Sequence, residues 1–143
     1  MKELVELGIV FRGFILVKHL FKNGYNHQDQ DPCKDLRGPF ITAINSFAQN
    51  AFNNLSLEYL ESSNNLFIFK VHEIKAQDSD YPEHIILYGL TERRKKDPDK
   101  LVKKFLEKSE PIIQLFISRY NNKDLTELSQ FEPFRDAIRE FFD

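Results

Sequence analysis

Two runs of β-branched and aromatic residues stand near the start of the chain, at 5–11 and 14–21, and only Arg12-Gly13 separates them. A two-residue connection that contains Gly is typical of a tight β-hairpin, because Gly takes positive φ angles at little cost. Neither run alternates with polar residues, so we predict that both faces of both strands are covered. Such strands require helices on both sides of their sheet.

Three more strand signals follow, at 55–60, 66–71 and 84–90. The first alternates polar and apolar residues, which is typical of an edge strand with one wetter face. The other two are apolar on both faces and are predicted to be central. With the hairpin, they predict a sheet of five antiparallel strands.

Two helical stretches are predicted after the last strand. Asp97 is placed to cap the first and Pro98 to begin it, where a missing amide costs nothing. Its apolar face continues to Tyr120, and Pro111 should kink it or divide it near Ser109. The second stretch covers 125–142 and is interrupted at Pro133.

The segment 35–52 is the long apolar-periodic segment between the two groups of strands, and it predicts a helix that begins near Gly38. One stripe at helical spacing is predicted to pack on the sheet: Leu36, Phe40, Ala43, Ile44, Phe47 and Ala51. A second stripe, roughly 110° away by the helical period, contains Ile41, Ala48 and Phe52.

A helix with one side in solvent does not need the second stripe, so we predict that it forms an apolar groove with the edge strand. A partner protein could occupy this groove or add a strand to the exposed edge. The alternative is that Ile41 and Phe52 merely pack under the loops. The predicted protein-binding residues are Ile41, Asn45, Ala48, Phe52, Leu57 and Tyr59.

The segment 93–108 is strongly basic, with eight basic and three acidic residues and a local net charge of +5. It could contact an acidic partner or make weak peripheral contact with an anionic membrane, although such a run is more often the solvated face of a helix. The candidate residues are Arg93, Arg94, Lys95, Lys96, Lys100, Lys103 and Lys104.

The composition is that of one globular domain covering 1–143, with 41% hydrophobic residues and a net charge of -2, and it suggests no nucleic-acid partner. A single Cys, Cys33, favours a reducing compartment, so a cytoplasmic location is expected. No stretch is long and apolar enough to be a predicted membrane span.

Catalytic, cofactor and metal sites are not predicted. The sequence lacks the P-loop, GxSxG and HExxH motifs. None of the four His residues has the spacing of a zinc site, although His72 and His84 could form a cross-strand pair. The loop acids Asp29, Asp31 and Asp35 lack the Gly and Glu of an EF-hand loop. No reaction can be read from the sequence.

The predicted elements form a three-layer α/β domain of order ββαβββαα, with one helix on one face of the sheet and two on the other. This order resembles the longin domain over nearly the whole chain. The residues that carry the resemblance are Asp35-Leu36-Arg37-Gly38-Pro39-Phe40-Ile41 with Ala43, Phe47 and Ala48, and the strand at 85–90 leading to Asp97-Pro98.

Longin domains occur in the small subunits of clathrin adaptors, in some vesicle SNARE proteins and as stand-alone archaeal proteins. The resemblance implies a non-catalytic interaction or scaffold module in GTPase regulation or vesicle trafficking. Its partner would be a small GTPase or another longin or roadblock-like chain, including a second copy in a homodimer. The alternative is a profilin-like sensor that binds a small ligand between sheet and helices, although the apolar stretches offer few of the convergent polar groups of a pocket.

Overall fold

The computed structural model describes residues 1–21, 36–51, 57–92 and 97–142. Within them, five strands form one antiparallel sheet of order β2-β1-β5-β4-β3. The predicted α/β class with five antiparallel strands is therefore confirmed. The elements are β1 (Leu4–Phe11), β2 (Phe14–Leu20), α2 (Arg37–Ala51), β3 (Tyr59–Glu61), β4 (Asn65–Ile74), β5 (Glu83–Glu92), α3 (Pro98–Tyr120), the 3-10 helix η3 (Leu128–Phe131) and α4 (Glu132–Phe142).

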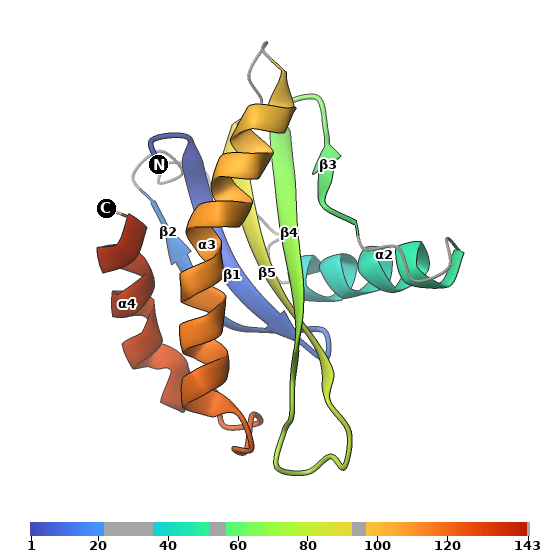
Figure 1. Ribbon diagram of the computed structural model, residues 1–143, viewed down its shortest axis with the longest axis vertical. Coiled ribbons are helices and arrows are strands. Elements are labelled where there is room, and N and C mark those ends of the chain that lie inside the picture. The colour runs from blue at the N-terminus through green and yellow to red at the C-terminus, as the bar shows by residue number, and fades with distance from the viewer. Residues whose placement is uncertain (22–35, 52–56, 93–96, 143) are drawn as a thin grey trace.

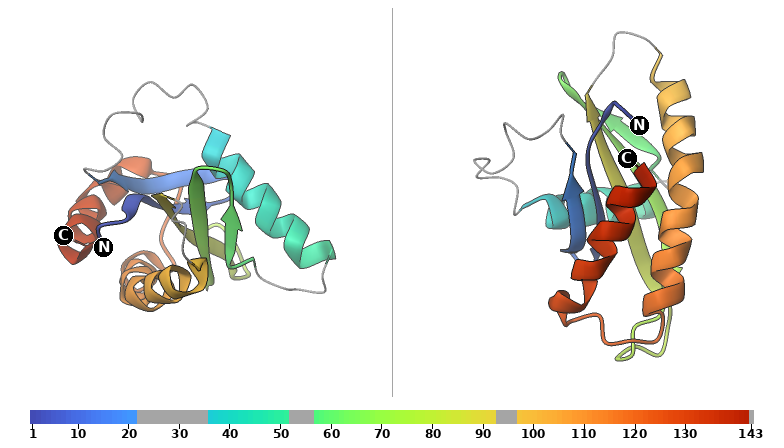
Figure 2. Two further views of the ribbon diagram at one scale, coloured as in Figure 1. Left: turned by 90° about the horizontal axis from the view of Figure 1, so that it is seen from above. Right: turned by 90° about the vertical axis from the view of Figure 1, so that its left-hand side faces the viewer.

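The helices lie on both faces of the sheet. Helix α3 runs lengthwise over the strands with α4 beside it, whereas α2 crosses the strands and extends past the β3 edge (Figure 1). The two turned views place α2 on the face opposite α3 and α4 (Figure 2). A large part of α2 is thus covered by the sheet on one side only.

The predicted hairpin is confirmed. Arg12 and Gly13 both have positive φ angles, 51° and 82°, as the tightest two-residue turns require. Strand β1 is buried along its whole length between β2 and β5. The prediction for β2 is wrong in part, because β2 is an edge strand in which Leu16 and Val17 alone are fully buried.

The remaining strands agree with their predicted roles. Strands β4 and β5 lie inside the sheet, and β3 pairs with β4 at the edge opposite β2. Strand β3 is shorter than predicted, and residues 55 and 56 lie outside the described residues.

Helix α3 begins as predicted, since the Asp97 carboxylate accepts a hydrogen bond from the Asp99 amide at 3.0 Å. The predicted division at Ser109 is wrong, because α3 continues through Pro111 to Tyr120. Its buried side, which includes Phe105, Ile112 and Phe116, offsets the hydrogen bond that Pro111 cannot donate. Pro133 lies in the first turn of α4, where proline is tolerated.

The sheet separates two apolar cores. The core under α3 and α4 is rich in aromatic rings, and the Phe116 ring lies 5.5 Å from Phe131 and 5.0 Å from Phe134. The core under α2 is smaller and consists of Val10, Ile41, Phe69, Ile86 and Tyr88. Helix α2 contributes only Ile41 to it, so its large side chains must lie elsewhere.

Candidate protein-interaction surface

A buried ion pair fixes the first turn of α2 to the sheet. The Glu6 side chain on β1 is fully buried, and one of its oxygens accepts a hydrogen bond from the Arg37 guanidinium. The other oxygen accepts a hydrogen bond from the Tyr88 hydroxyl at 2.5 Å. Burial and the nearby Glu6 charge raise the pKa of Tyr88 well above its usual value. The sequence alone does not reveal this cluster, because its three members are far apart in the chain.

Small residues let α2 approach the sheet closely. A side-chain carbon on Gly38 would lie 2.5 Å from the Gly13 carbonyl oxygen, so only glycine fits there without a shift of the backbone. The buried residues of α2 are Gly38, Ile41, Asn45 and Ala48. Their spacing of three and four residues is that of one helix face. A search for large apolar residues alone does not find this face, because Gly38, Asn45 and Ala48 are small or polar.

The stripe predicted to pack on the sheet instead faces solvent. Leu36 is 62% exposed, Phe40 45% and Phe47 66%. Ala43 and Ala51 are also exposed, and Ile44 is half-buried. The prediction was wrong because it assigned the larger residues to the interior, whereas the close approach at Gly38 selects the smaller ones. We call these six residues the α2 apolar surface: Leu36, Phe40, Ala43, Ile44, Phe47 and Ala51.

The residues predicted to bind a partner are mostly not available for binding. Ile41 is 0% exposed, and Asn45 and Ala48 are also buried under α2. Tyr59 packs with the core under α3, and its hydroxyl lies 3.4 Å from Asp99 of that helix. Its neighbour Leu60 packs on the α2 side, because adjacent strand residues face opposite sides of the sheet. Leu57 is half-buried on the α2 side, and Phe52 lies outside the described residues.

The α2 apolar surface continues onto the sheet. The Phe40 ring lies 6.3 Å from the half-buried Phe67 ring on β4. Phe67 in turn stacks on Phe69. Leu57 and Leu60, also half-buried, pack against the same core. The apolar side chains beside α2 therefore include the predicted Leu57, together with Phe40, Leu60 and Phe67, which were not among the predicted binding residues.

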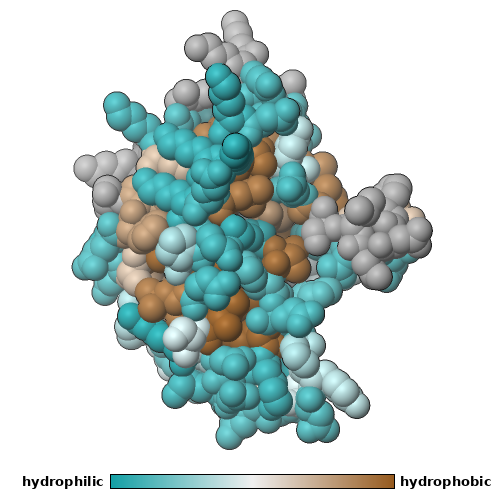
Figure 3. Space-filling view, viewed as in Figure 1, coloured by the Kyte–Doolittle hydropathy of each residue, from teal (hydrophilic) through white to brown (hydrophobic). Residues whose placement is uncertain are grey.

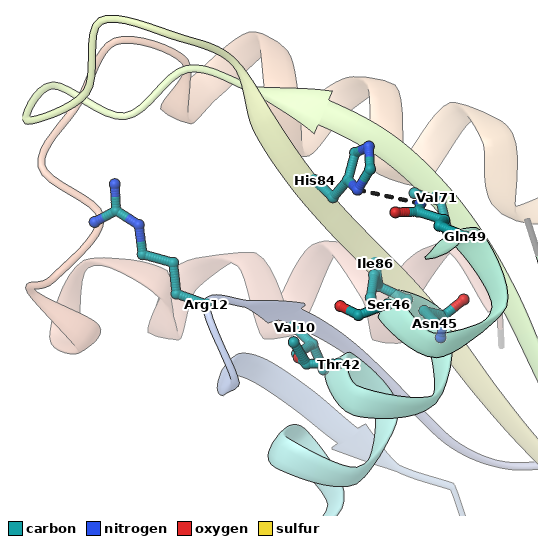
Figure 4. A pocket seen from close by; sticks show the side chains of 9 residues that line it. All are labelled: Val10, Arg12, Thr42, Asn45, Ser46, Gln49, Val71, His84 and Ile86. Carbon is teal, nitrogen blue, oxygen red and sulfur yellow. Dashed lines mark hydrogen bonds between the residues drawn. The ribbon is translucent and has the colours of Figure 1, made fainter. Parts of the chain in front are cut away.

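A small cleft lies along the side of α2 that is opposite the α2 apolar surface. It has a volume of about 50 Å³ and lies between polar residues of α2 and the sheet (Figure 4). The Gln49 amide and a His84 ring nitrogen lie 3.2 Å apart across it. Thr42 Oγ1 and Asn45 Oδ1 have no hydrogen-bond partner among the described residues. The cleft has room for about one or two water molecules, which could satisfy these atoms.

The basic candidates divide between described and undescribed parts of the chain. Lys100, Lys103 and Lys104 are exposed on α3, while residues 93–96 lie outside the described residues. On the face that carries α3 and α4, hydrophilic residues cover much of the surface and divide its apolar areas (Figure 3).

Other ionisable groups that lie together hold elements to one another. Arg12 in the hairpin turn pairs with Asp78 and Glu83, which lowers the pKa of both acids. Lys70 and His72 of β4 lie 2.5 and 3.0 Å from Glu110 of α3. These pairs join strands and helices, and Arg12 also lines the small cleft beside α2.

His72 and His84 do not form the conceivable cross-strand pair, because Glu73 rather than His72 is opposite His84 in the register. His72 contacts Glu110 of α3 and His84 contacts Gln49 of α2, so the two rings lie on opposite faces of the sheet. Among the described residues, no three His, Cys, Asp or Glu side chains are grouped as metal ligands. None of the described helices has the length and hydropathy of a membrane span.

Comparison with known proteins does not assign the chain to a family. No family model matches the sequence. No curated protein matches it significantly.

Proposed function

We propose that this chain is a non-catalytic protein-interaction module of the longin type, which binds its partner through the α2 apolar surface. The observation that carries the proposal is the exposure of two Phe side chains, Phe40 and Phe47, on one helix face. Large contiguous apolar patches are rare on proteins that bind nothing, and aromatic residues are enriched in protein interfaces.

The longin part of the proposal is supported by the arrangement of the described elements. Two strands, a helix, three strands and two long helices follow one another, with α2 across the sheet face opposite α3 and α4. The partner is accordingly a small GTPase or another longin or roadblock-like chain. The process served would be GTPase regulation or a trafficking-like function at a cytoplasmic location, which the basic residues of α3 could bring close to a membrane.

The rival function, a small-ligand sensor, is disfavoured by the size of the cleft under α2. Ligand pockets have volumes of about 300 to 1,000 Å³, whereas this cleft has about 50 Å³. An enzymatic function is disfavoured because the ionisable groups that lie together join strands and helices.

The proposal is tested by placing a photo-crosslinking amino acid at Phe47 of the full chain in cells. Leu115, an exposed apolar residue of α3, is the matched control position. We expect position 47 to capture a discrete protein that position 115 does not, and that mass spectrometry identifies as a GTPase or as a longin or roadblock-like chain. Binding of this protein should fall at least tenfold in the Phe47→Asp variant.

Equal capture from both positions, or none from position 47, would contradict the proposal. A small molecule retained by the purified chain in native mass spectrometry would favour the sensor instead.

A further inference from the structure

Helix α2 differs from the other described α-helices, α3 and α4, in having no charged residue on its exposed face. Its single charged residue is Arg37, whose guanidinium points inward to the buried Glu6. Helices α3 and α4 carry several charged residues each, such as Lys103, Lys104 and Arg135, on their exposed sides. The centres of protein interfaces are depleted of charge, so α2 has the composition of such a centre and α3 and α4 do not.

The absence of charged residues on the exposed face of α2 indicates which kind of partner can bind there. In a dimer with two-fold symmetry, residues near the axis face their own copies. The exposed lysines Lys100, Lys103 and Lys104 of α3 would therefore meet like charges, which opposes association. The α2 apolar surface brings no like charges together. Among the described α-helices, α2 is thus the one whose exposed face suits a second copy of the same chain.

The sizes of the side chains also fit a second copy. Phe40, Ala43 and Phe47 form a large, small, large series on one face of α2. Phe40 and Phe47 are seven residues apart, which is about 10 Å along the helix axis. If two α2 helices run antiparallel about an axis near Ala43, Phe40 of each copy lies beside Phe47 of the other. The small Ala43 then leaves room for the helices to approach closely and for the rings to pack beside it.

We propose that a second copy of this chain binds the α2 apolar surface, with the two α2 helices antiparallel about a two-fold axis near Ala43. This proposal rests on the surface assigned under the proposed function and names its partner. The α2 apolar surface has six residues, whereas a stable complex of roughly 800 Å² per partner uses about 20 to 30 residues a side. The dimer is therefore expected to dissociate at micromolar concentrations and to form as concentration rises.

The first experiment measures the mass of the purified chain by sedimentation equilibrium from about 1 to 500 μM, a range chosen for an interface of this size. We expect the mass to rise from 16.9 kDa toward twice that value. Phe47→Asp and Phe40→Asp should each weaken association at least tenfold. Leu115→Asp and Phe141→Asp, at exposed apolar positions of α3 and α4, should not.

The second experiment tests the antiparallel arrangement with complementary charges. Phe40→Asp and Phe47→Lys chains should each be monomeric, but their mixture should form a heterodimer. In that heterodimer the carboxylate introduced at position 40 of one chain lies beside the ammonium group introduced at position 47 of the other, while the two remaining rings, Phe47 and Phe40, meet. A mixture of Phe40→Asp with Phe40→Lys is the control and should associate less. Circular dichroism of every variant checks that the fold is kept.

A wild-type chain that stays at 16.9 kDa up to 500 μM overturns the proposal. So does a dimer that persists in a folded Phe47→Asp variant. A Phe40→Asp and Phe47→Lys mixture that remains monomeric overturns the antiparallel arrangement. None of these results affects capture of a different protein at position 47 in cells, so failure of this inference is distinguishable from failure of the proposed function.

Discussion

The two faces of the sheet are built in opposite ways. On one face, α3 and α4 bury large rings such as Phe105, Phe116 and Phe134 and present charged residues to solvent. On the other, α2 buries Gly38, Ile41, Asn45 and Ala48 and presents Phe40 and Phe47. The first arrangement is that of a helix that completes a core. The second is that of a helix that the sheet holds close and whose larger side chains remain available to a partner.

The contrast shows that a helix can be anchored without burying its largest side chains. The ion pair between Arg37 and Glu6 and the close contact at Gly38 fix α2 at its first turn. The burial of Ile41 therefore needs to contribute less to holding α2 on the sheet. The outer face of α2 is free to be apolar because it does not hold the domain together.

The largest effect on stability is expected when the same substitution, Phe to Ala, is compared between the two faces of the sheet. Phe116→Ala removes a fully buried ring and should lower the free energy of unfolding by about 3 to 5 kcal/mol. Phe47→Ala removes an exposed ring and should change the stability of the monomer by no more than about 0.5 kcal/mol. Urea denaturation at low protein concentration measures both. Similar losses from the two variants would show that Phe47 is part of the core.

A smaller effect is expected from the anchor of α2. Arg37→Met leaves the buried Glu6 carboxylate without its cation and should destabilise the chain by about 3 kcal/mol. Hydrogen exchange should accelerate mainly in α2, since α3 does not depend on this pair. The control is Arg139→Met, which removes an exposed pair with Asp136 and should cost less than about 1 kcal/mol. Equal exchange in α2 and α3 would argue against a local anchor.

The smallest effect concerns the pair that holds α3 to β4. Partial burial opposes ionisation of Glu110, but hydrogen bonds from Lys70, Gln114 and His72 outweigh it and lower the pKa of Glu110 from 4.5 to about 2. Because the folded-state pKa is the lower one, the stabilisation is complete above about pH 4.5 and is lost as the pH falls toward 2. Glu110→Gln should therefore be less stable than the native chain near pH 7, with a difference that vanishes in this acid range.

The difference at neutral pH should be less than about 1 kcal/mol, because the Glu110 side chain is more than a third exposed. Urea denaturation at several pH values measures it. In a Lys70→Met background the effect of Glu110→Gln should shrink. A constant difference between pH 7 and pH 2 would mean that the side chain acts by packing and not by charge.

Local patterns in the sequence predicted much of the fold. A two-residue connection that contains Gly between dense apolar runs specifies the hairpin at Arg12-Gly13. The Asp97 side chain and the Pro98 ring start α3 by local geometry alone. Burial on both faces of β5 follows from its unbroken apolar run. Pro111 does not divide α3 as one alternative predicted, because tertiary burial of the helix outweighs one lost hydrogen bond.

The sequence by itself determined that 35–52 would form a helix with more apolar surface than one side requires. Only the tertiary structure decided which side is inward. Periodicity gives the angle between Phe40 and Ile41 about the helix axis but not the direction of the sheet. That direction is set by the Gly38 contact with the hairpin turn and by the ion pair of Arg37 with Glu6, which join residues distant in sequence.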